Sequence, residues 1–392
     1  MYRLRLSLIF LTIATTLSAQ FQIGHTSRTF VDPARNDRPI LTDIYYPAAT
    51  AGDNVPVAGG QFPVISFGHG FVMVWSAYQN FWETLVPQGY ILCFPRTEGS
   101  FSPSHTDFAR DLAFLCSALE NEKGQPASPF FEHILSRYCI MGHSMGGGCT
   151  VLAYAYNPDL IKCIATFAPA NTNPSAIAVA PDVAVPSLTF AGADDCIAPP
   201  AQQALPIFEA LDTAACKLYI SIDGGSHCQF ANANTNCNLG EVLSGCANPP
   251  VSAMVQQGIV SNLLLPWLHN YLQDLPGFWQ PLLDTLAAEN GFSSLNRCVI
   301  TSGLPETAFS GLRIEIQSNP VWDDELVVRL AGVEQMPVDL AIYAASGRLL
   351  THVRQPTEEV MRISTANFAS GLYYLVIIGK DGKSAVGRFL KM

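Results

Sequence analysis

The chain has 392 residues, 49% of them hydrophobic and 14% charged, and carries a formal net charge of -11. This composition supplies enough apolar side chains for a large core and excludes an intrinsically disordered chain. The acidic balance argues against nucleic-acid binding, which needs clustered basic side chains, and against attachment to an anionic membrane by charge.

The N-terminus has the pattern of a secretory signal peptide at residues 1–19. Arg3 and Arg5 precede a mostly apolar run, Leu6–Leu17, and Leu17-Ser18-Ala19 offers a small-residue cleavage site before Gln20. The run is too short to span a bilayer well. A buried N-terminal strand is the alternative interpretation. We therefore expect an exported protein.

From about residue 20 to residue 300, short apolar runs alternate with segments of helical spacing. The expected strands are Pro63–Phe67, Tyr90–Phe94, Tyr138–Met141, Cys163–Phe167, Ser187–Phe190 and Lys217–Ser221. The expected helices cover Tyr78–Pro87, the stretch after Thr106 and Cys149–Tyr156. Strands that are apolar throughout and separated by helices indicate a mostly parallel sheet covered on both faces. We predict an α/β domain over residues 20–300, with a site at the carboxyl ends of its strands.

The pattern changes after a linker that we place at residues 301–311, around Pro305. From residue 312 to residue 392 the runs are short and alternate apolar with polar side chains, as in Leu312–Ile316 and Leu326–Leu330. Turn signals such as Ser346-Gly347 and Asp381-Gly382 separate them. Many short strands at regular intervals predict a small antiparallel β-sandwich.

The eleven cysteines suit an exported protein, because disulfides persist outside the cytosol. Three lie in apolar, strand-like runs and are expected to be buried thiols: Cys93, Cys139 and Cys163. Five lie in polar, loop-like segments and are better disulfide candidates: Cys196, Cys228, Cys237, Cys246 and Cys298. The spacing fixes no pairing. No cysteine or histidine cluster has zinc-site spacing, so we expect no metal.

A G-x-S-x-G motif, Gly142–Gly146, supplies the main chemical signal. An apolar strand ends just before it at Met141, and a glycine-rich helix start follows it. This strand-turn-helix context is what a nucleophile elbow needs, because the strained turn lifts the serine hydroxyl above the sheet edge. We therefore predict Ser144 as the nucleophile. An ordinary glycine-rich turn is the alternative.

A serine hydroxyl needs a base, and the base needs an orienting carboxylate. Behind a nucleophile elbow the chain order is serine, acid, histidine. Of the three histidines that follow Ser144, only His227 lies in a loop after a predicted parallel strand. His269 lies in a helical run, and His352 lies in the predicted sandwich. We therefore expect His227 to be the base.

The acid comes from the loop after the predicted strand Ser187–Phe190. Asp194 and Asp195 both lie there and both precede His227. Spacing alone does not choose between them, and three other aspartates fit the end of a parallel strand less well: Asp182, Asp212 and Asp223. An oxyanion hole needs two amides. We expect one from Met145 and the other from the loop Gly68–Phe71.

The region from about residue 22 to residue 298 resembles bacterial cutinases and poly(ethylene terephthalate) hydrolases, in patches. Gly142–Gly148 is similar to their elbow, Asp195–Pro199 to their acid loop, and Gly224–His227 to the loop of their catalytic histidine. The resemblance implies an α/β-hydrolase fold and a Ser-His-Asp triad, and it favours Asp195 over Asp194.

The same resemblance implies roles for residues around the cleft. Phe71 stands where these enzymes place an aromatic residue that donates an oxyanion amide and clamps the acyl group. Met145 and Ile197 are then expected to line an open, apolar cleft. The chain departs from the family in three segments: Ala170–Pro174 lacks the usual tryptophan, Cys228 replaces a serine or phenylalanine, and the insert Asn232–Pro250 is longer than expected.

The last eighty or so residues resemble the C-terminal sorting domain of the Bacteroidota type IX secretion system. The matching features are Ser318-Asn319-Pro320, Ser346-Gly347-Arg348, Ala369–Tyr374 and the terminal Lys391. The resemblance implies the type IX secretion machinery as a partner, export through the periplasm to the cell surface or the medium, and removal of the domain. A sandwich that binds a carbohydrate or another polymer is the alternative.

Together these observations predict a secreted serine carboxylic ester hydrolase, cutinase-like or polyesterase-like, that acts on an ester or polyester through an acyl-enzyme. We expect no metal, no organic cofactor and a monomer. The first alternative is a small-ester or lipid acetylhydrolase with the same triad, because Arg38–Pro47 also resembles dienelactone-hydrolase and platelet-activating-factor acetylhydrolase relatives. The second is an exported binding protein with an inactive hydrolase fold.

Overall fold

A computed structural model describes residues 21–246, 248–288, 290–298, 313–317, 319–322, 324–331, 338–344, 348–354, 360–379 and 384–392. The predicted signal peptide at 1–19, the predicted linker at 301–311 and the motif residues Ser318, Ser346 and Gly347 lie outside these ranges. Within them, no helix combines the length and the apolar character needed to cross a membrane.

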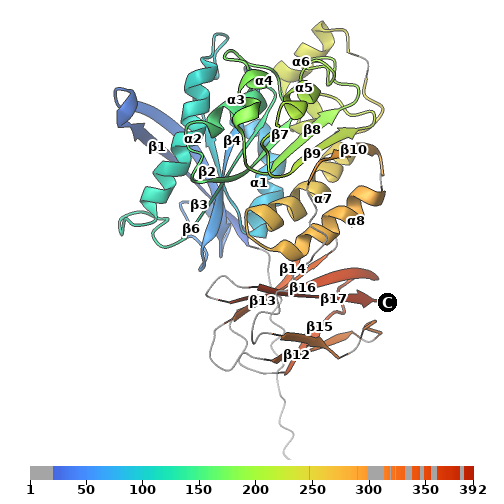
Figure 1. Ribbon diagram of the computed structural model, residues 1–392. Coiled ribbons are helices and arrows are strands. Elements are labelled where there is room, and N and C mark those ends of the chain that lie inside the picture. The colour runs from blue at the N-terminus through green and yellow to red at the C-terminus, as the bar shows by residue number, and fades with distance from the viewer. Residues whose placement is uncertain are drawn as a thin grey trace, which may run out of the picture.

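A ten-stranded sheet dominates the first part of the chain, with the strand order β10-β9-β8-β7-β6-β4-β5-β2-β1-β3 (Figure 1). Its six central strands run parallel: β4 (Phe62–Gly68), β5 (Ile91–Pro95), β6 (Ile134–His143), β7 (Ile161–Phe167), β8 (Ser187–Gly192) and β9 (Lys217–Ile222). These strands are almost wholly buried, as strands covered on both faces must be. The predicted α/β-hydrolase fold with a mostly parallel sheet is confirmed.

Antiparallel strands extend the sheet at both sides. β10 (Phe292–Asn296) pairs with β9, and β2 (Arg38–Ala48) pairs with both β5 and β1 (Gln22–Asp32). The two-residue β3 (Gly52–Asp53) lies parallel to β1. These strands were not predicted from the sequence, because polar residues interrupt their apolar runs.

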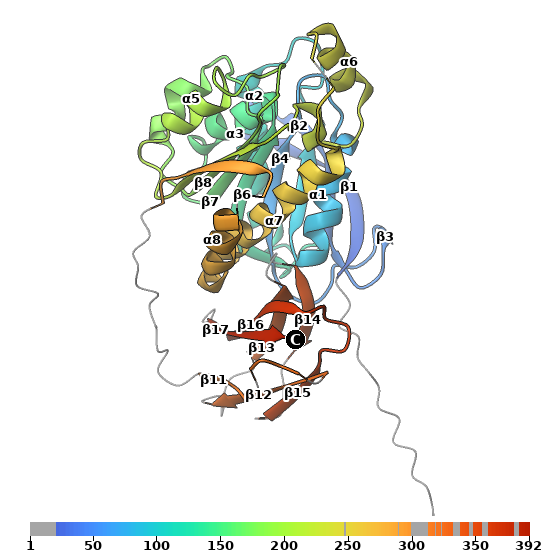
Figure 2. The same ribbon diagram turned by 90° about the vertical axis from the view of Figure 1, so that its right-hand side faces the viewer.

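Helices cover both faces of the sheet (Figures 1 and 2). One face carries α2 (His105–Glu122), α3 (Met145–Tyr154), α4 (Ala176–Val179) and α5 (Ala204–Glu209), and the other carries α1 (Gln79–Leu85), α7 (Ala253–Tyr271) and α8 (Trp279–Ala288). Short 3-10 helices are η1 (Pro33–Arg35), η2 (Trp75–Tyr78), η3 (Val86–Gln88), η4 (Ala180–Asp182), η5 (Cys228–Phe230) and η6 (Pro276–Phe278). The core therefore consists of two apolar layers, one on each side of the sheet. In contrast, α6 (Thr235–Leu243) contains no buried residue.

The C-terminal part is all-β, as predicted. A three-stranded sheet has the order β11-β12-β15, and a four-stranded sheet has the order β14-β13-β16-β17. The strands are β11 (Arg313–Ile316), β12 (Glu325–Ala331), β13 (Val338–Ala344), β14 (Leu349–Arg354), β15 (Val360–Ser364), β16 (Gly371–Gly379) and β17 (Ser384–Lys391). Every pair within the two sheets is antiparallel, and side chains from both sheets share one apolar core.

An apolar seam joins the two parts of the chain. Leu275 and Phe278, which follow α7, form one buried cluster with Tyr343, Leu349 and Val376 of the sandwich. The rings of Phe278 and Tyr343 lie edge to face with centroids 4.6 Å apart. The seam lies at the C-terminal end of α7, and this helix of 19 residues is about 28 Å long. The sandwich therefore contacts the end of the molecule that is remote from the start of α7 (Figure 2).

Candidate active site

Ser144 occupies a strained turn between β6 and α3. Its backbone has φ 56 and ψ -119, a conformation typical of a nucleophile elbow. The turn is fixed because the Ser144 amide donates to the Phe167 carbonyl at 2.9 Å and the Ser144 carbonyl accepts from the Ala170 amide at 3.0 Å. A side chain at Gly146 would collide with the backbone carbonyl of Gly68, so the close approach of helix and strand requires glycine there.

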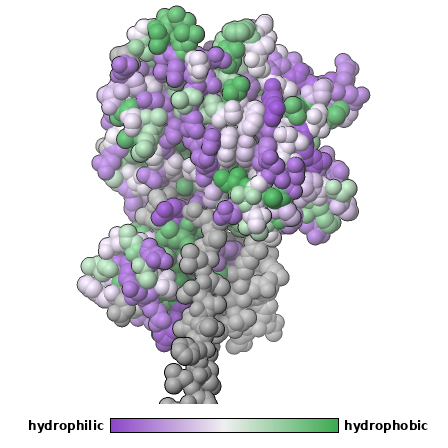
Figure 3. All heavy atoms as spheres, turned by 180° about the vertical axis from the view of Figure 1, so that it is seen from behind, coloured by the Kyte–Doolittle hydropathy of each residue, from purple (hydrophilic) through white to green (hydrophobic). Residues whose placement is uncertain are grey.

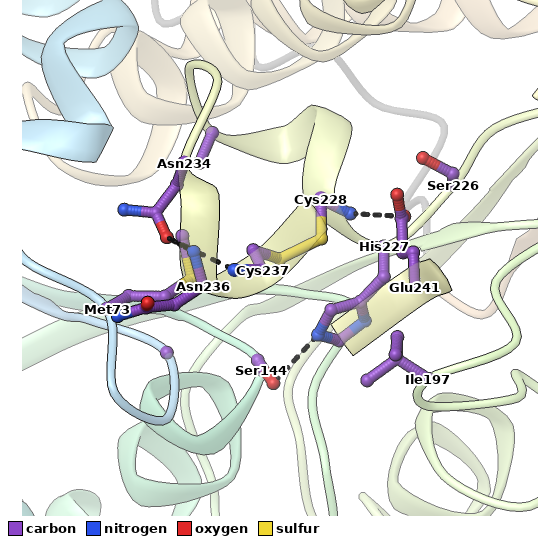
Figure 4. The surroundings of a disulfide bond; sticks show 12 residues. Met73, Ser144, Ile197, Ser226, His227, Cys228, Asn234, Asn236, Cys237 and Glu241 are labelled. Carbon is purple, nitrogen blue, oxygen red and sulfur yellow. Dashed lines mark hydrogen bonds between the residues drawn. A yellow bond between two sulfur atoms is a disulfide. The ribbon is translucent and has the colours of Figure 1, made fainter. Parts of the chain in front are cut away.

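The structure brings together the three side chains that the sequence singled out, from the loops that follow β6, β8 and β9. His227 Nε2 lies 2.9 Å from Ser144 Oγ (Figure 4). His227 Nδ1 lies 2.7 Å from Asp195 Oδ2. All three residues are buried. Because an ionised carboxylate only accepts hydrogen bonds, Nδ1 carries the proton, which leaves Nε2 free to accept from the serine hydroxyl.

The acid loop holds Asp195 by its second oxygen. Asp195 Oδ1 accepts hydrogen bonds from the amides of Ile197 at 2.9 Å and Ala198 at 2.8 Å. The carboxylate is therefore fixed on both sides, by its own loop and by the imidazole. Asp194, the alternative that spacing left open, is exposed.

The base loop is held by a glutamine from the start of α7. The side-chain amide of Gln256 accepts from the Ser226 amide at 3.0 Å and donates to the Ser226 carbonyl at 2.9 Å. Gln256 is fully buried, so its amide has no competing water. This paired contact fixes the peptide that immediately precedes His227. Gln256 was not predicted as a site residue from the sequence.

A second buried network passes beneath the triad and was also missed. The Tyr78 hydroxyl accepts from the Gly70 amide at 2.7 Å and lies 3.0 Å from His143 Nδ1. His143 Nε2 lies 3.0 Å from the His227 carbonyl oxygen, which only accepts, so Nε2 carries the proton and Nδ1 accepts from Tyr78. Burial, followed by the nearby His227, holds the pKa of His143 well below its usual value and keeps the ring neutral. The network therefore connects the Gly70 loop to the base loop.

Three further residues were expected to line a cleft beside Ser144, namely Phe71, Met145 and Ile197. Met145 is the first residue of α3, so its amide belongs to the N–H groups that have no partner within the helix. Phe71 follows β4, is 46% exposed, and packs edge to face on Phe101 with centroids 6.3 Å apart. Ile197 is half-buried, and its side chain lies beside His227 (Figure 4).

Three disulfides are present, Cys196–Cys246, Cys216–Cys298 and Cys228–Cys237. All five predicted candidates take part, whereas Cys216 was missed because it adjoins a predicted strand. The remaining five cysteines are buried thiols: Cys93, Cys116, Cys139, Cys149 and Cys163. Burial raises the pKa of the Cys116 thiol to about 12, which suppresses the reactive thiolate. No group of metal-ligating side chains occurs among the described residues.

Comparisons with known proteins place this geometry in a family. A family model described as PET hydrolase-like matches residues 41–244. A bis(hydroxyethyl) terephthalate hydrolase of Streptomyces coelicolor is 27% identical over 194 residues, which cover 49% of this chain and 56% of that protein. Cutinase 1 of Thermobifida cellulosilytica is 37% identical over 92 residues, 24% of this chain and 33% of that protein. Cutinase est2 of Thermobifida alba is 35% identical over 105 residues, which cover 27% of this chain and 33% of that protein.

The chain thus spans about half of the Streptomyces protein and about a third of the cutinases that it matches. The family model covers just over half of the chain, including the elbow, the acid loop and the base loop. This chain belongs to the PET hydrolase-like family.

Proposed function

We propose that this protein is an exported serine carboxylic ester hydrolase of the cutinase or polyester hydrolase type. The observation that carries the proposal is the unbroken hydrogen-bonded series from Ser144 through His227 to Asp195, buried at the carboxyl ends of parallel strands. This arrangement is the one that makes an ordinary alcohol nucleophilic, because the imidazole accepts the hydroxyl proton as the oxygen attacks.

The reaction then has two halves. Ser144 Oγ attacks the ester carbonyl while His227 takes its proton, and the amides of Met145 and Phe71 stabilise the oxyanion. His227 returns the proton to the departing alcohol, which leaves an acyl-enzyme. His227 then takes a proton from water as the water oxygen attacks the acyl carbon, and it returns that proton to Ser144 Oγ as the bond to the acyl carbon breaks and the acid departs. Throughout, Asp195 orients the imidazole and stabilises its charged form.

Two kinds of ester are candidates for the substrate. The names of the relatives favour a polyester or its terephthalate fragments. A small-ester or lipid acetylhydrolase would use the same triad, and comparing soluble short-chain esters with polyester film separates the two. The segment Ala170–Pro174, which lacks an aromatic residue, makes an aliphatic polyester the first film to test.

The decisive experiment is labelling by a fluorophosphonate probe, which reacts only with an activated serine. Wild type is expected to label and to hydrolyse p-nitrophenyl acetate, whereas Ser144→Ala is expected to do neither. Ser102→Ala, which removes an exposed serine, serves as the matched control. Ester turnover by Ser144→Ala would reject the assignment, and an unlabelled wild type would favour the inactive, binding-protein alternative.

We further infer the organisation of the whole chain: signal peptide at 1–19, catalytic domain at 20–300, linker at 301–311 and type IX sorting domain at 312–392. The antiparallel sandwich supports this division. A reporter fused to residues 301–392 is expected to reach the cell surface in a host with type IX secretion. The same fusion without residues 384–392, which include β17, is expected to stay in the periplasm. A sandwich that instead adsorbs to polymer film would favour the binding-module alternative.

A further inference from the structure

We propose that α6 and its flanking loop form a docking surface for the apolar face of a solid polyester, fixed to the catalytic loops by two disulfides. This proposal rests on the proposed esterase function and names the part of the molecule that holds the insoluble substrate. The docking surface consists of three exposed side chains of α6: Leu239, Val242 and Leu243.

Two disulfides attach the α6 segment directly beside the triad. Cys228, which follows His227, is bonded to Cys237 within α6. Cys196, which follows Asp195, is bonded to Cys246 beyond the end of the helix. The segment is therefore held at both ends by the loops that carry the proposed acid and base.

Hydrogen bonds add to this attachment (Figure 4). Glu241 Oε1 accepts from the Cys228 amide at 3.0 Å. Asn236 Nδ2 donates to the carbonyl oxygen of Val72 at 2.8 Å, and Val72 adjoins Phe71 in the loop proposed to supply an oxyanion amide. Thus the α6 segment contacts all three loops of the site, and a substrate bound to the helix would be held at a fixed position relative to those loops.

The helix exposes its apolar side chains, which is the reverse of the usual arrangement. Cys237, Gly240 and Glu241 are spaced by three and four residues and face the catalytic loops, where Gly240 approaches Ile197. Leu239, Val242 and Leu243 have the same spacing on the opposite side, and are 53%, 73% and 77% exposed. A surface helix ordinarily turns its apolar stripe toward the core. An outward apolar stripe therefore indicates a partner outside the fold.

The chemistry of the stripe selects a neutral, apolar partner. Between residues 232 and 246 the only charged side chain is Glu241, which already accepts a hydrogen bond from the Cys228 amide. A charged polymer or a charged headgroup would find no counter-charge there. Figure 3, which views the molecule from behind, shows apolar side chains gathered at the end of the molecule where α6 lies.

Apolar side chains continue from α6 to the catalytic loops. Ile197 lies between Gly240 of α6 and His227 (Figure 4). Phe71 adjoins Val72, which α6 contacts, and it packs on Phe101; these two rings are 46% and 85% exposed. A flat substrate resting on α6 would thus also meet Ile197 beside His227 and the two exposed rings of the neighbouring loops. This continuity favours the ester substrate itself as the occupant over a second copy of the chain.

The test compares two matched pairs of exposed apolar residues in the full chain. Val242→Ser/Leu243→Ser alters the docking surface, and Val31→Ser/Leu41→Ser alters β1 and β2, where these residues are 50% and 39% exposed. Adsorption to polyester film is measured by depletion in a Ser144→Ala background, so that it does not depend on turnover. The α6 pair is expected to weaken adsorption about tenfold and the β1–β2 pair by less than twofold.

The same pairs in the active enzyme separate docking from chemistry. For the α6 pair, kcat/KM on p-nitrophenyl acetate is expected to stay within about twofold of wild type, while release of products from film falls about tenfold at low enzyme concentration. Unchanged adsorption, or equal losses in both pairs, would overturn the docking surface. Two results would overturn the docking surface by identifying another occupant. One is that the α6 pair abolishes a dimer that sedimentation detects for the wild type. The other is that the α6 pair abolishes binding to neutral phosphatidylcholine vesicles while adsorption to film is unchanged. If wild type fails to hydrolyse the soluble ester, the proposed function fails, and the adsorption result still decides the docking surface.

Discussion

Replacing Tyr78 by phenylalanine tests the buried network beneath the triad. The change removes one hydroxyl and leaves two buried groups without partners, the Gly70 amide and His143 Nδ1. Each unpaired buried group costs about 1–3 kcal/mol, so the free energy of unfolding is expected to fall by about 3 kcal/mol. For a domain of this size, that loss lowers the melting temperature by roughly 6–12 °C.

The matched control is Tyr46→Phe. Tyr46 is also buried, but among the described residues its hydroxyl has one hydrogen-bond partner, the Val55 carbonyl at 2.7 Å, and neither residue belongs to the loops of the triad. Here the expected loss is about 1 kcal/mol, or roughly 2–4 °C. Calorimetry at pH 7.5 with disulfides intact measures both variants, and steady-state kinetics should show a lower kcat only for Tyr78→Phe. If the two variants melted together and turned over equally, the network would have no special role.

The remaining predictions concern the supports of the two catalytic loops. Burial holds the pKa of His143 well below the ordinary 6.5, so the ring is neutral in the folded protein. Its contribution to the free energy of unfolding is complete above pH 6.5 and decreases as the pH falls below that value, by as much as about 1.4 kcal/mol per pH unit. His143→Gln should therefore flatten the decline in melting temperature that the wild type shows between pH 7.5 and 5.5. Gln256→Met removes the hydrogen bonds to the amide and the carbonyl of Ser226. On a soluble ester, kcat should fall about tenfold with little change in KM, because His227 is less well positioned. A tenfold rise in KM would argue against a positioning role. Cys228→Ala/Cys237→Ala removes the α6 disulfide that closes the shorter loop of the chain, and should lower the free energy of unfolding by about 2–3 kcal/mol, measured by thermal unfolding. It should also reduce hydrolysis of film more than hydrolysis of a soluble ester, and equal proportional losses on both substrates would contradict the docking role of α6.

The central sheet could be predicted because most of its parallel strands are buried on both faces and therefore appear in the sequence as short apolar runs, as Tyr90–Phe94 and Tyr138–Met141 show. The elbow could be predicted for a related reason, since its strain requires small residues at fixed positions around Ser144. Strands with mixed faces, such as β1, β14 and β17, carry no such signal and were missed.

The supports of the site could not be predicted, because they depend on contacts between distant parts of the chain. Nothing in the sequence around Gln256 or Tyr78 distinguishes them from other residues of helical segments, and only folding places them against Ser226 and His143. The choice of Asp195 over Asp194 likewise needed either a resemblance or the contact itself. The helix α6 did leave a local signal, because Asn234 caps it by accepting from the amides of Asn236 and Cys237.

The apolar seam beside Phe278 bears on how the tail would leave the enzyme. A protease that cut the predicted linker would break the chain but would leave Tyr343, Leu349 and Val376 still packed against Leu275 and Phe278. After the cut, the tail would be a separate molecule, and its dissociation from the catalytic part would increase as the protein is diluted. Proteolysis and release are then distinct events. Release would expose Leu275 and Phe278, and so give the catalytic part a second apolar surface at the end of the molecule away from α6.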